Sequence, residues 1–368
     1  MVPIKISCLT FHDSLNYGAV LQAYALQTYC IKNGYEYEII NYSNVEKHKF
    51  DSVFGRNKEL PLLVYFYKLL QFPYHMYKKH KFKNFSKKYL HVSKRYKLYQ
   101  QLKDYAKTRD AILVGSDQVW NISMVREDPI YFLDFADANK RISYAASLGL
   151  AVLNESQRQF YSKMLSDFEH ISVREETGKE IVLQASGKNA QVVVDPTLLL
   201  SKKDWKKIAV YRKPGKYIFA YILRHDPEVQ IFLEKLKKQT GLPVIYVSRG
   251  YISAVRDKAT AVPSPQKWVG LIMDATYVVT TSFHGTAFSV NFHRNFYTFV
   301  KGKITDDTNS RQVGFLKSLG LENRLNPEAL EEICLDPPDY TMADQVLASK
   351  RMEARQFLES ALKKVTET

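Results

Sequence analysis

The chain has 368 residues, 45% of them hydrophobic, and its 53 Lys and Arg against 38 Asp and Glu give a net charge of +15. This length is too great for one ordinary hydrophobic core, so we expect two domains. The positive charge favours an anionic partner, such as a phosphorylated substrate, nucleic acid or an anionic membrane surface.

The cysteine pattern and the hydropathy indicate the compartment of the protein and argue against a structural metal or a membrane-spanning helix. The three cysteines (Cys8, Cys30 and Cys334) are widely spaced, with no CxxC pair and no zinc-ligand spacing. This pattern argues for a reducing compartment and against a structural metal. No segment resembles a signal-peptide core or approaches the roughly 18 apolar residues of a spanning helix. We therefore expect a cytoplasmic protein, with a peripheral position on the inner face of the cytoplasmic membrane left open.

Residues 1–200 predict an N-terminal domain of alternating strands and helices. A helix at 19–33, stopped by Gly34, lies between strands at 4–10 and 37–40. Such a β-α-β unit implies a parallel sheet with a right-handed crossover. The same alternation continues with strands at 111–114, 141–146, 171–173 and 192–194 and a helix at 154–167. We expect a Rossmann-like, doubly wound domain.

Residues 46–107 interrupt this pattern with a segment rich in Lys, Arg, Tyr and Phe. Its apolar residues recur every three or four positions, which predicts a helical insertion with one basic face. Three interpretations remain open: a solvated insertion packed on the core, a surface that approaches anionic lipid, and a nucleic-acid site. No recognised nucleic-acid module accompanies the segment, so no nucleic-acid partner is expected.

A basic, proline-closed stretch at 201–214 predicts a linker, after which a second β-α-β series occupies residues 215–335. Its expected elements are strands at 217–222, 244–247, 276–280 and 295–300 and helices at 227–240 and 265–274. The final residues, 336–368, predict an amphipathic helix that packs back on the N-terminal domain. The expected architecture is two α/β halves with a cleft between them.

Ligands of open α/β sheets bind beyond the carboxyl ends of the strands, so the loops there are the candidate sites. Near Asn16, Tyr17 and Gly18, an N-cap precedes a glycine that permits close backbone approach, although an ordinary capped turn explains both. The loop with Ser116, Asp117, Gln118 and Asn121 suits a ligand rich in hydroxyls; alternatively, Asp117 and Asn121 cap a turn.

Two further strand ends carry ionisable residues. Arg174 offers a fork for a carboxylate or phosphate, unless it pairs with Glu175 or Glu176 in a surface network. His284 lies between Ser282 and Thr286 where a strand turns into a helix, and it is either a proton-transfer group or a structural histidine. The chain has no Gly-x-Ser-x-Gly, His-Glu-x-x-His or Walker motif and no zinc spacing, which favours acid/base chemistry without a metal.

The order of these blocks resembles the polysaccharide pyruvyl transferase family over residues 4–325. The matching segments are 16–19 with 21–24, 115–121, 172–175, 195–197, 281–285, and 310–311 ahead of 319–321. The resemblance implies two Rossmann-like halves facing across a cleft, as in GT-B glycosyltransferases. It further implies phosphoenolpyruvate as donor, a sugar as acceptor, pyruvate ketals on bacterial surface glycans as products, and no cofactor.

The resemblance implies roles for individual residues of this chain that match the family's motifs. His284 and Arg174 are the expected catalytic residues. The expected donor-binding residues are Ser282, Phe283, Gly285, Thr286, Arg311 and Lys301. The expected acceptor-binding residues are Asn16, Tyr17, Gly18, Ser116, Asp117, Gln118 and Asn121. Some members carry arginine where this chain has Ser282, so Arg174, Arg311 or Lys301 would have to replace that charge.

The leading hypothesis is a pyruvyl transferase acting on a galactose-type or related hexose carried by a polyprenyl diphosphate or a nucleotide. The basic aromatic segment favours the lipid-linked acceptor, because an anionic membrane and a diphosphate both attract positively charged side chains. Two alternatives remain: a nucleotide-sugar glycosyltransferase of the same architecture, and a non-catalytic glycan- or lipid-binding protein in which His284 is structural.

Overall fold

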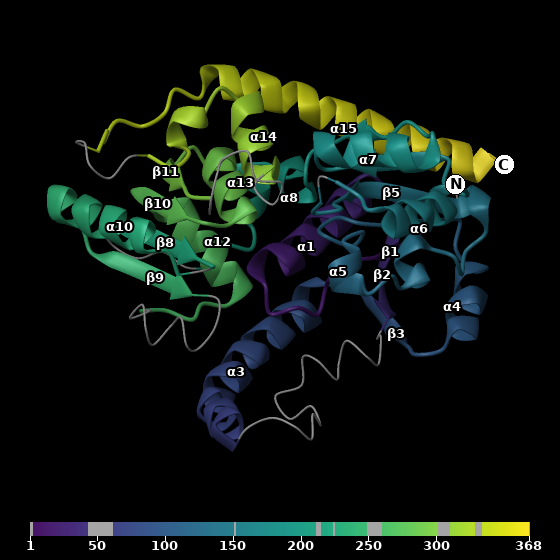
Figure 1. Cartoon of the computed structure of the whole chain (residues 1–368), viewed down its shortest axis with the longest axis horizontal. Coiled ribbons are helices and arrows are strands. Elements are labelled where there is room, and N and C mark those ends of the chain that lie inside the picture. The colour runs from purple at the N-terminus through teal and green to yellow at the C-terminus, as the bar shows by residue number, and fades with distance from the viewer. Residues whose placement is uncertain are drawn as a thin grey trace.

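The computed structural model describes residues 3–42, 62–150, 152–210, 215–223, 225–248, 260–300, 310–327 and 333–367; side chains are not described for 62–70 and 310. Residues 46–61 of the expected insertion and the candidate Lys301 therefore lie outside the described residues. Figure 1 shows two α/β halves side by side, with one long helix crossing both.

The N-terminal half is built on a seven-stranded parallel sheet in the order β3-β2-β1-β4-β5-β6-β7. Its strands are β1 (Lys5–Leu9), β2 (Glu36–Tyr42), β3 (Val92–Tyr96), β4 (Ala111–Val114), β5 (Arg141–Ala146), β6 (His170–Val173) and β7 (Gln191–Val192). The chain winds outward from β1 in one direction and from β4 in the other. This is the doubly wound topology that the β-α-β pattern predicts.

Helices cover this sheet, so its central strands are buried along their whole length. Every residue of β4 and β5 is buried, as expected for strands covered on both faces. The helices of this half are α1 (Tyr17–Lys32), α3 (Leu62–Tyr89), α4 (Tyr99–Ala106), α5 (Ile122–Val125), α6 (Glu155–Leu165) and α7 (Glu176–Ser186). Asn16 caps α1 by accepting a hydrogen bond from the backbone N–H of Gly18 at 2.9 Å.

The expectation of a wholly helical insertion at 46–107 is wrong for its second part. The helix α3 ends at Tyr89, and β3 then pairs with β2 at the edge of the sheet before α4 begins. In β3, Ser93 and Tyr96 are buried, whereas Lys94 and Arg95 are exposed. Because of this charged pair, the sequence of the strand does not differ from the basic segment around it. Exposed charges are tolerated here because the strand is at the edge of the sheet.

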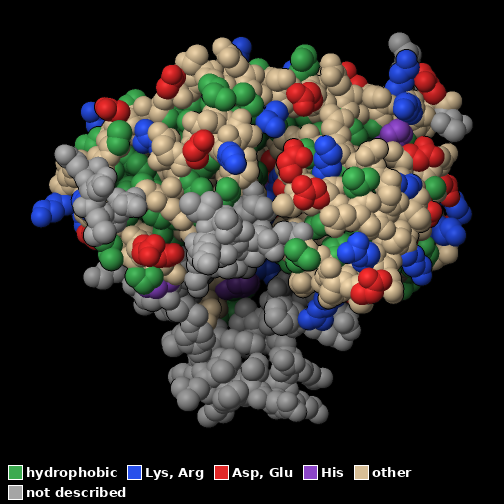
Figure 2. Space-filling model, turned by 45° about the horizontal axis from the view of Figure 1, so that its top comes forward, with side chains coloured by type: hydrophobic (Ala, Val, Ile, Leu, Met, Phe, Trp, Pro, Cys, Tyr) green, Lys and Arg blue, Asp and Glu red, His purple; other side chains and the backbone are tan. Residues whose placement is uncertain are grey.

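The C-terminal half has a four-stranded parallel sheet in the order β11-β10-β8-β9. Its strands are β8 (Ile218–Ile222), β9 (Val244–Ser248), β10 (Tyr277–Thr280) and β11 (Asn295–Thr298), and its helices are α10 (Pro227–Thr240), α12 (Pro265–Asp274), α13 (Phe283–Asn291) and α14 (Ser310–Ser318). The fold is thus α/β, with two Rossmann-like doubly wound domains. On the face drawn in Figure 2, acidic side chains lie among Lys and Arg side chains over both lobes.

The expected linker at 201–214 lies between the two sheets, and its described part, as far as residue 210, is packed against both halves. Two short helices, α8 (Pro196–Leu199) and α9 (Lys202–Trp205), connect the halves. The fully buried Trp205 contacts the rings of Tyr24 in α1 and Phe288 in α13, at centroid distances of 5.7 and 4.8 Å. A buried tryptophan contributes a large apolar area, so this joint holds the two halves in place.

A second contact joins α1 directly to the C-terminal half. The ring of Tyr17 stacks on that of Trp268, with centroids 5.5 Å apart and planes within 10°, and its hydroxyl donates to the carbonyl of Pro263 at 2.8 Å. One hydrophobic cluster includes both residues and extends into both sheets. The halves therefore share a core at the first turn of α1.

The C-terminal helix α15 (Thr341–Glu367) runs across the two halves in Figure 1. Arg351 donates to the carbonyl of Leu198 at 2.6 Å and to the side chain of Asn291 in α13 at 2.8 Å. Gln191 of β7 donates to the carbonyl of Glu353. None of the described helices is both long and apolar enough to cross a membrane.

Candidate active site

The two sheets bring three polar side chains and one glycine to one place at the junction of the halves. Arg174 follows β6, Asp195 follows β7, and Gly18 lies in the first turn of α1, all in the N-terminal half. His284 lies in the first turn of α13, directly after β10 of the other half. The site therefore lies where the strand ends of both domains meet, as expected for parallel α/β sheets.

Asp195 is the centre of this cluster and is completely buried. Its Oδ1 accepts hydrogen bonds from the backbone N–H of Thr197 at 3.0 Å and from the Thr197 hydroxyl at 2.7 Å. Its Oδ2 accepts from Nη1 of Arg174 at 2.9 Å and from Oγ of Ser116 at 3.3 Å. Burial alone would raise the pKa of this carboxyl, but the charges of His284 and Arg174 and the bond from Thr197 hold the pKa well below its ordinary value.

His284 belongs to the C-terminal half but contacts residues of the N-terminal half. Its Nε2 lies 3.5 Å from Oδ2 of Asp195 and has no hydrogen-bond partner among the described residues. The opposite side of the ring lies against α1, where a Cβ added to Gly18 would come within 2.0 Å of Nδ1. A side chain at position 18 would displace the imidazole, so glycine is required for this close approach.

Arg174 forms ion pairs with carboxylates, but two of its nitrogens make no hydrogen bond to any described residue. Its side chain is 2% exposed, and its guanidinium carbon lies 4.7 Å from the ring centroid of Phe283. Beyond Asp195, the nearest carboxylates are Asp117 at 3.7 Å from Nη2 and Glu175 at 3.8 Å from Nε. Burial opposes its charge, but these three carboxylates raise the pKa of the guanidinium. Nε and Nη2 make no hydrogen bond within the described part of the chain. Buried donors of this kind are rarely left unpaired, so they are suited to receive an anion.

Arg311, on α14, supplies a second cation beside the first. Burial and the positive charge of Arg174 lower the pKa of its guanidinium, while Glu175, Asp117 and Asp195 act in the opposite direction. The side chain is half-buried and makes no ion pair with any described residue. Two guanidinium groups held close together favour an anion between them.

The other expected donor residues mostly build the turn that presents His284. Ser282 caps α13 by accepting from the backbone N–H of Gly285. Gly285 packs against Thr280, whose Oγ1 would lie 2.3 Å from an added Cβ. Thr286 bonds to Ser282 and to Thr298 inside the fold, and Phe283 lies beneath Arg174.

The expected acceptor residues fall into two groups. Asn16 is an exposed helix cap, Tyr17 is buried in the shared core, and Ser116 is buried with hydrogen bonds to Gln22, Ala145 and Asp195. Asp117 and Gln118 are half-buried and lie in the loop after β4. The amides of Gln118 and Asn121 both face Gly149, where an added Cβ would lie 2.4 and 2.7 Å from their nitrogens. Asp117, Gln118 and Asn121 form the polar loop nearest Arg174.

Two carboxylates of the site were not predicted as site residues. Asp195 belongs to a block that carries the family resemblance, and an acidic residue before Pro196 at a strand end is the signal that could have identified it. Glu175 was expected only as a surface partner of Arg174, but it is buried. Its Oε1 accepts from Ser147 and from the backbone N–H groups of Leu148 and Gly149, so it fixes the loop after β5.

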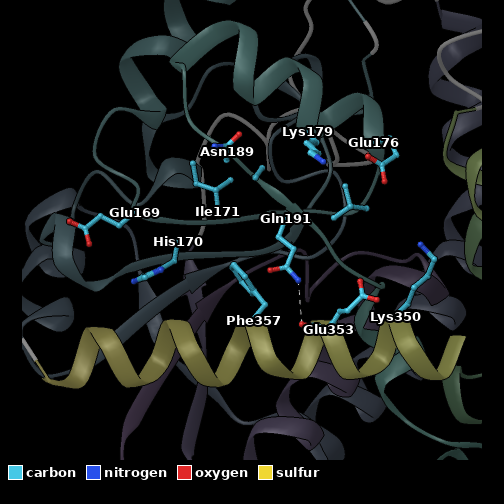
Figure 3. Close-up of a pocket in the computed structure, with 12 residues that line it drawn as sticks. Glu169, His170, Ile171, Glu176, Lys179, Asn189, Gln191, Lys350, Glu353 and Phe357 are labelled. Carbon is cyan, nitrogen blue, oxygen red and sulfur yellow. Dashed lines mark hydrogen bonds between the residues drawn. The ribbon is translucent and has the colours of Figure 1, made fainter. Parts of the chain in front are cut away.

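A groove of about 600 Å³ lies elsewhere, along the outer edge of the first sheet. Figure 3 shows it between β6, β7, α7 and α15, with Gln191 bonded across to Glu353. Its lining is largely polar, including the charged Glu169, Lys179 and Lys350, and none of the cluster around Asp195 lines it. It lies beside an edge strand and not at the strand ends, so it is not the candidate active site.

Three solved structures align with nearly the whole chain at low sequence identity. UDP-N-acetylglucosamine 2-epimerase from Rickettsia bellii aligns with a TM-score of 0.48 and 10% identity, covering 100% of this chain and 99% of that one. The enzyme of the same name from Neisseria meningitidis, bound to UDP-GlcNAc, aligns with 0.48 and 11%, covering 99% and 94%. The E. coli heptosyltransferase WaaC with ADP aligns with 0.42 and 10%, covering 99% and 100%.

No curated protein sequence matches the chain. A family model does, and it spans the polar loops of the first half, the Arg174 and Asp195 strand ends, and the His284 turn. The model that matches residues 16–300 describes the polysaccharide pyruvyl transferases, and the chain belongs to that family.

Proposed function

We propose that this protein transfers the pyruvyl group of phosphoenolpyruvate to two hydroxyls of a galactose-type hexose in a bacterial surface-polysaccharide precursor. The product is a cyclic ketal, and phosphate is released. One observation carries the proposal: Nε and Nη2 of buried Arg174 and Nε2 of His284, side chains that share the Asp195 carboxylate, make no hydrogen bond within the described part of the chain. An anion-binding fork next to a proton donor is the pairing that this reaction needs.

The residues divide the chemistry between them. Arg174 and Arg311 hold the carboxylate and phosphate of the donor, and Arg311 replaces the charge that some family members carry at position 282. His284 protonates the methylene carbon, which creates an oxocarbenium-like centre at the neighbouring carbon for the acceptor hydroxyl to attack. Asp195 keeps the imidazole and the guanidinium together through Oδ2.

Helix α3 supports an acceptor linked to polyprenyl diphosphate. Its 28 residues include seven lysines and no Asp or Glu. From Phe72 onward, Phe72, Met76, Lys79, Lys83 and Lys87 are exposed at helical spacing along one face. The opposite face contacts the body of the protein, where Phe82 packs on Tyr17. A face with apolar residues at one end and lysines at the other suits the surface of an anionic membrane.

The test is incubation with phosphoenolpyruvate and a panel of hexose acceptors on lipid and nucleotide carriers. We expect phosphate release together with the mass gain of a pyruvate ketal. The His284→Ala variant should lose turnover while keeping its fold and most of its affinity for phosphoenolpyruvate. If no acceptor yields either signal with the wild-type protein, the proposal fails.

The same proteins separate the alternatives. A nucleotide-sugar glycosyltransferase would gain thermal stability from UDP- or GDP-sugars and not from phosphoenolpyruvate. A non-catalytic glycan- or lipid-binding protein would show ligand binding that His284→Ala leaves unchanged and no turnover in either form.

A further inference from the structure

Ketal formation needs a base as well as an acid. The methylene carbon of the donor gains one proton, and the two acceptor hydroxyls each lose one; of these, one replaces the proton given to carbon and the other leaves with phosphate. A single imidazole that has just donated its proton can accept only one of them. The site should therefore hold a second group able to take a proton from a hydroxyl.

Three carboxylates surround Arg174, and they differ in how they are engaged and in how far they are exposed. Both oxygens of Asp195 accept hydrogen bonds from neighbouring groups. Glu175 holds the loop at residues 147–149 through Oε1, while its Oε2 is buried without a hydrogen bond from any described residue, 3.8 Å from Nε of Arg174. The Asp117 carboxylate accepts no hydrogen bond from any residue that the structure describes, and its nearest charged neighbour is Nη2 of Arg174 at 3.7 Å. Its side chain is 13% exposed, against 0% for Asp195 and 5% for Glu175. Asp117 is the carboxylate that a ligand can reach.

The backbone holds Asp117 in an unusual position. Its φ is 70°, in the left-handed region that residues other than glycine seldom occupy. Its carbonyl accepts from the N–H groups of Val119 and Ser147, which fixes the loop between β4 and β5. Strained backbone that the surrounding structure enforces is typical of functional positions. In this conformation Oδ1 of the carboxylate lies 3.7 Å from Nη2 of Arg174.

We propose that Asp117 is the general base that activates the first acceptor hydroxyl, opposite His284 as the acid; this rests on the proposed function. As the hydroxyl oxygen bonds to the carbon bearing the phosphate ester, its proton passes to the Asp117 carboxylate. Asp117 then returns that proton to the departing phosphate as the carbon–oxygen bond to phosphate breaks. The second hydroxyl closes the ring and gives its proton to His284, which restores both groups.

The order of groups in the site fits this division. Asp117 contacts one nitrogen of Arg174, Asp195 contacts another, and His284 lies beyond Asp195. The base and the acid therefore lie at opposite ends of one chain of charges, with the guanidinium that holds the donor between them. If the acceptor approaches the donor from the side of Asp117, the methylene carbon of the donor stays accessible to His284.

The test compares Asp117→Asn with Asp137→Asn, an exposed aspartate in the same domain. Asparagine tolerates the left-handed backbone as aspartate does, and Asp117→Gly removes the carboxylate at a position where glycine is unstrained. With folding checked by circular dichroism and melting temperature, both Asp117 variants should lower kcat for phosphate release by about 100-fold or more. Their Kd for phosphoenolpyruvate should stay within a few-fold of wild type, because no group that holds the donor is lost. Asp137→Asn should match wild type in both measurements.

Other results overturn the assignment. If folded Asp117→Asn keeps more than about a hundredth of wild-type kcat, the base lies elsewhere. If its affinity for phosphoenolpyruvate falls in parallel with kcat, Asp117 serves the donor-binding arginine instead. Failure of the wild-type protein to turn over any acceptor would refute the proposed function itself, and the Asp117 assignment with it.

Discussion

His284 and Asp195 face each other across the boundary between the two halves, with Nε2 of the imidazole 3.5 Å from Oδ2 of the carboxylate. The same oxygen accepts the hydrogen bond from Arg174. One buried carboxylate therefore positions both the proposed anion-binding group and the proposed proton donor, although they come from different domains.

Asp195→Asn should destabilise the protein on the order of 3 kcal/mol near neutral pH, because it leaves the buried Arg174 without its closest counter-charge. The pKa of Asp195 is depressed in the folded state. Its contribution to the free energy of unfolding is therefore fully present above the unfolded-state pKa of about 4, and it is lost as the pH falls through the folded-state value.

Melting temperatures of wild type and Asp195→Asn, measured from pH 7 down to pH 3, check this expectation. The difference between the two proteins should be largest at neutral pH and should narrow below about pH 4. A difference that stays constant over the whole range would show that folding does not lower the pKa of this carboxyl.

Gly18→Ala should impair activity through His284. The added Cβ would lie 2.0 Å from Nδ1 and 2.3 Å from Cγ of the imidazole, so either the ring or α1 must move. We expect a loss of stability of about 1–3 kcal/mol and a loss of kcat on the order of 100-fold, since small displacements of reacting groups have large effects. Phosphate-release assays and thermal melts measure both.

Gly314→Ala is the matched control. Position 314 lies within α14, and nothing is found within 4 Å of an added Cβ there. Alanine should stabilise this helix by up to about 1 kcal/mol and leave kcat unchanged. Equal activity of the wild type and Gly18→Ala would mean that the imidazole does not need its observed position.

The sequence predicted the elements that alternate regularly and missed those that only tertiary contacts reveal. Strands such as Ala111–Val114 are continuous apolar runs, so their burial is evident. The edge strand Val92–Tyr96 carries Lys94 and Arg95 on its exposed side and resembles its basic surroundings. Trp205 lies in a basic stretch that predicts a linker, and only the structure shows that both halves enclose it.

The same distinction holds in the site. His284 and Arg174 were recognisable because each is an ionisable residue that follows a strand. Their convergence depends on how the two sheets are placed, which no local pattern encodes. The roles of Asp195 and Glu175 depend on that placement too, since a carboxylate after a strand has the same sequence signature whether it binds a ligand, pairs with a buried arginine or caps a turn.

Arg351→Met should weaken the attachment of α15 to the rest of the protein. The guanidinium bonds to the carbonyl of Leu198 in the joint and to Asn291 in α13. Asn291 in turn donates to the carbonyls of Thr197 and Leu200. Loss of two charge-assisted hydrogen bonds, with their acceptors left buried, should cost about 2–3 kcal/mol in urea unfolding. Lys363→Met, an exposed change on the same helix, should stay within about 0.5 kcal/mol of wild type.

Reversing three charges on the exposed face of α3 should abolish binding to anionic membranes. The triple variant Lys79→Glu, Lys83→Glu and Lys87→Glu changes three exposed lysines on one face of α3, each worth about 1 kcal/mol at an anionic surface. Co-sedimentation with phosphatidylcholine vesicles containing phosphatidylserine should show binding of the wild type that falls at least 100-fold in the variant and weakens with salt.

A control of equal charge separates this face from net charge alone. Lys103→Glu, Lys163→Glu and Lys238→Glu alter three exposed lysines on α4, α6 and α10 and change the net charge by the same amount. If binding depends on the α3 face, this control keeps most of the wild-type affinity, and Met76→Ser weakens binding by removing an exposed apolar contact. Equal loss in both triple variants would mean that the overall positive charge is what the vesicles attract, and the case for a lipid-linked acceptor would lose its structural support.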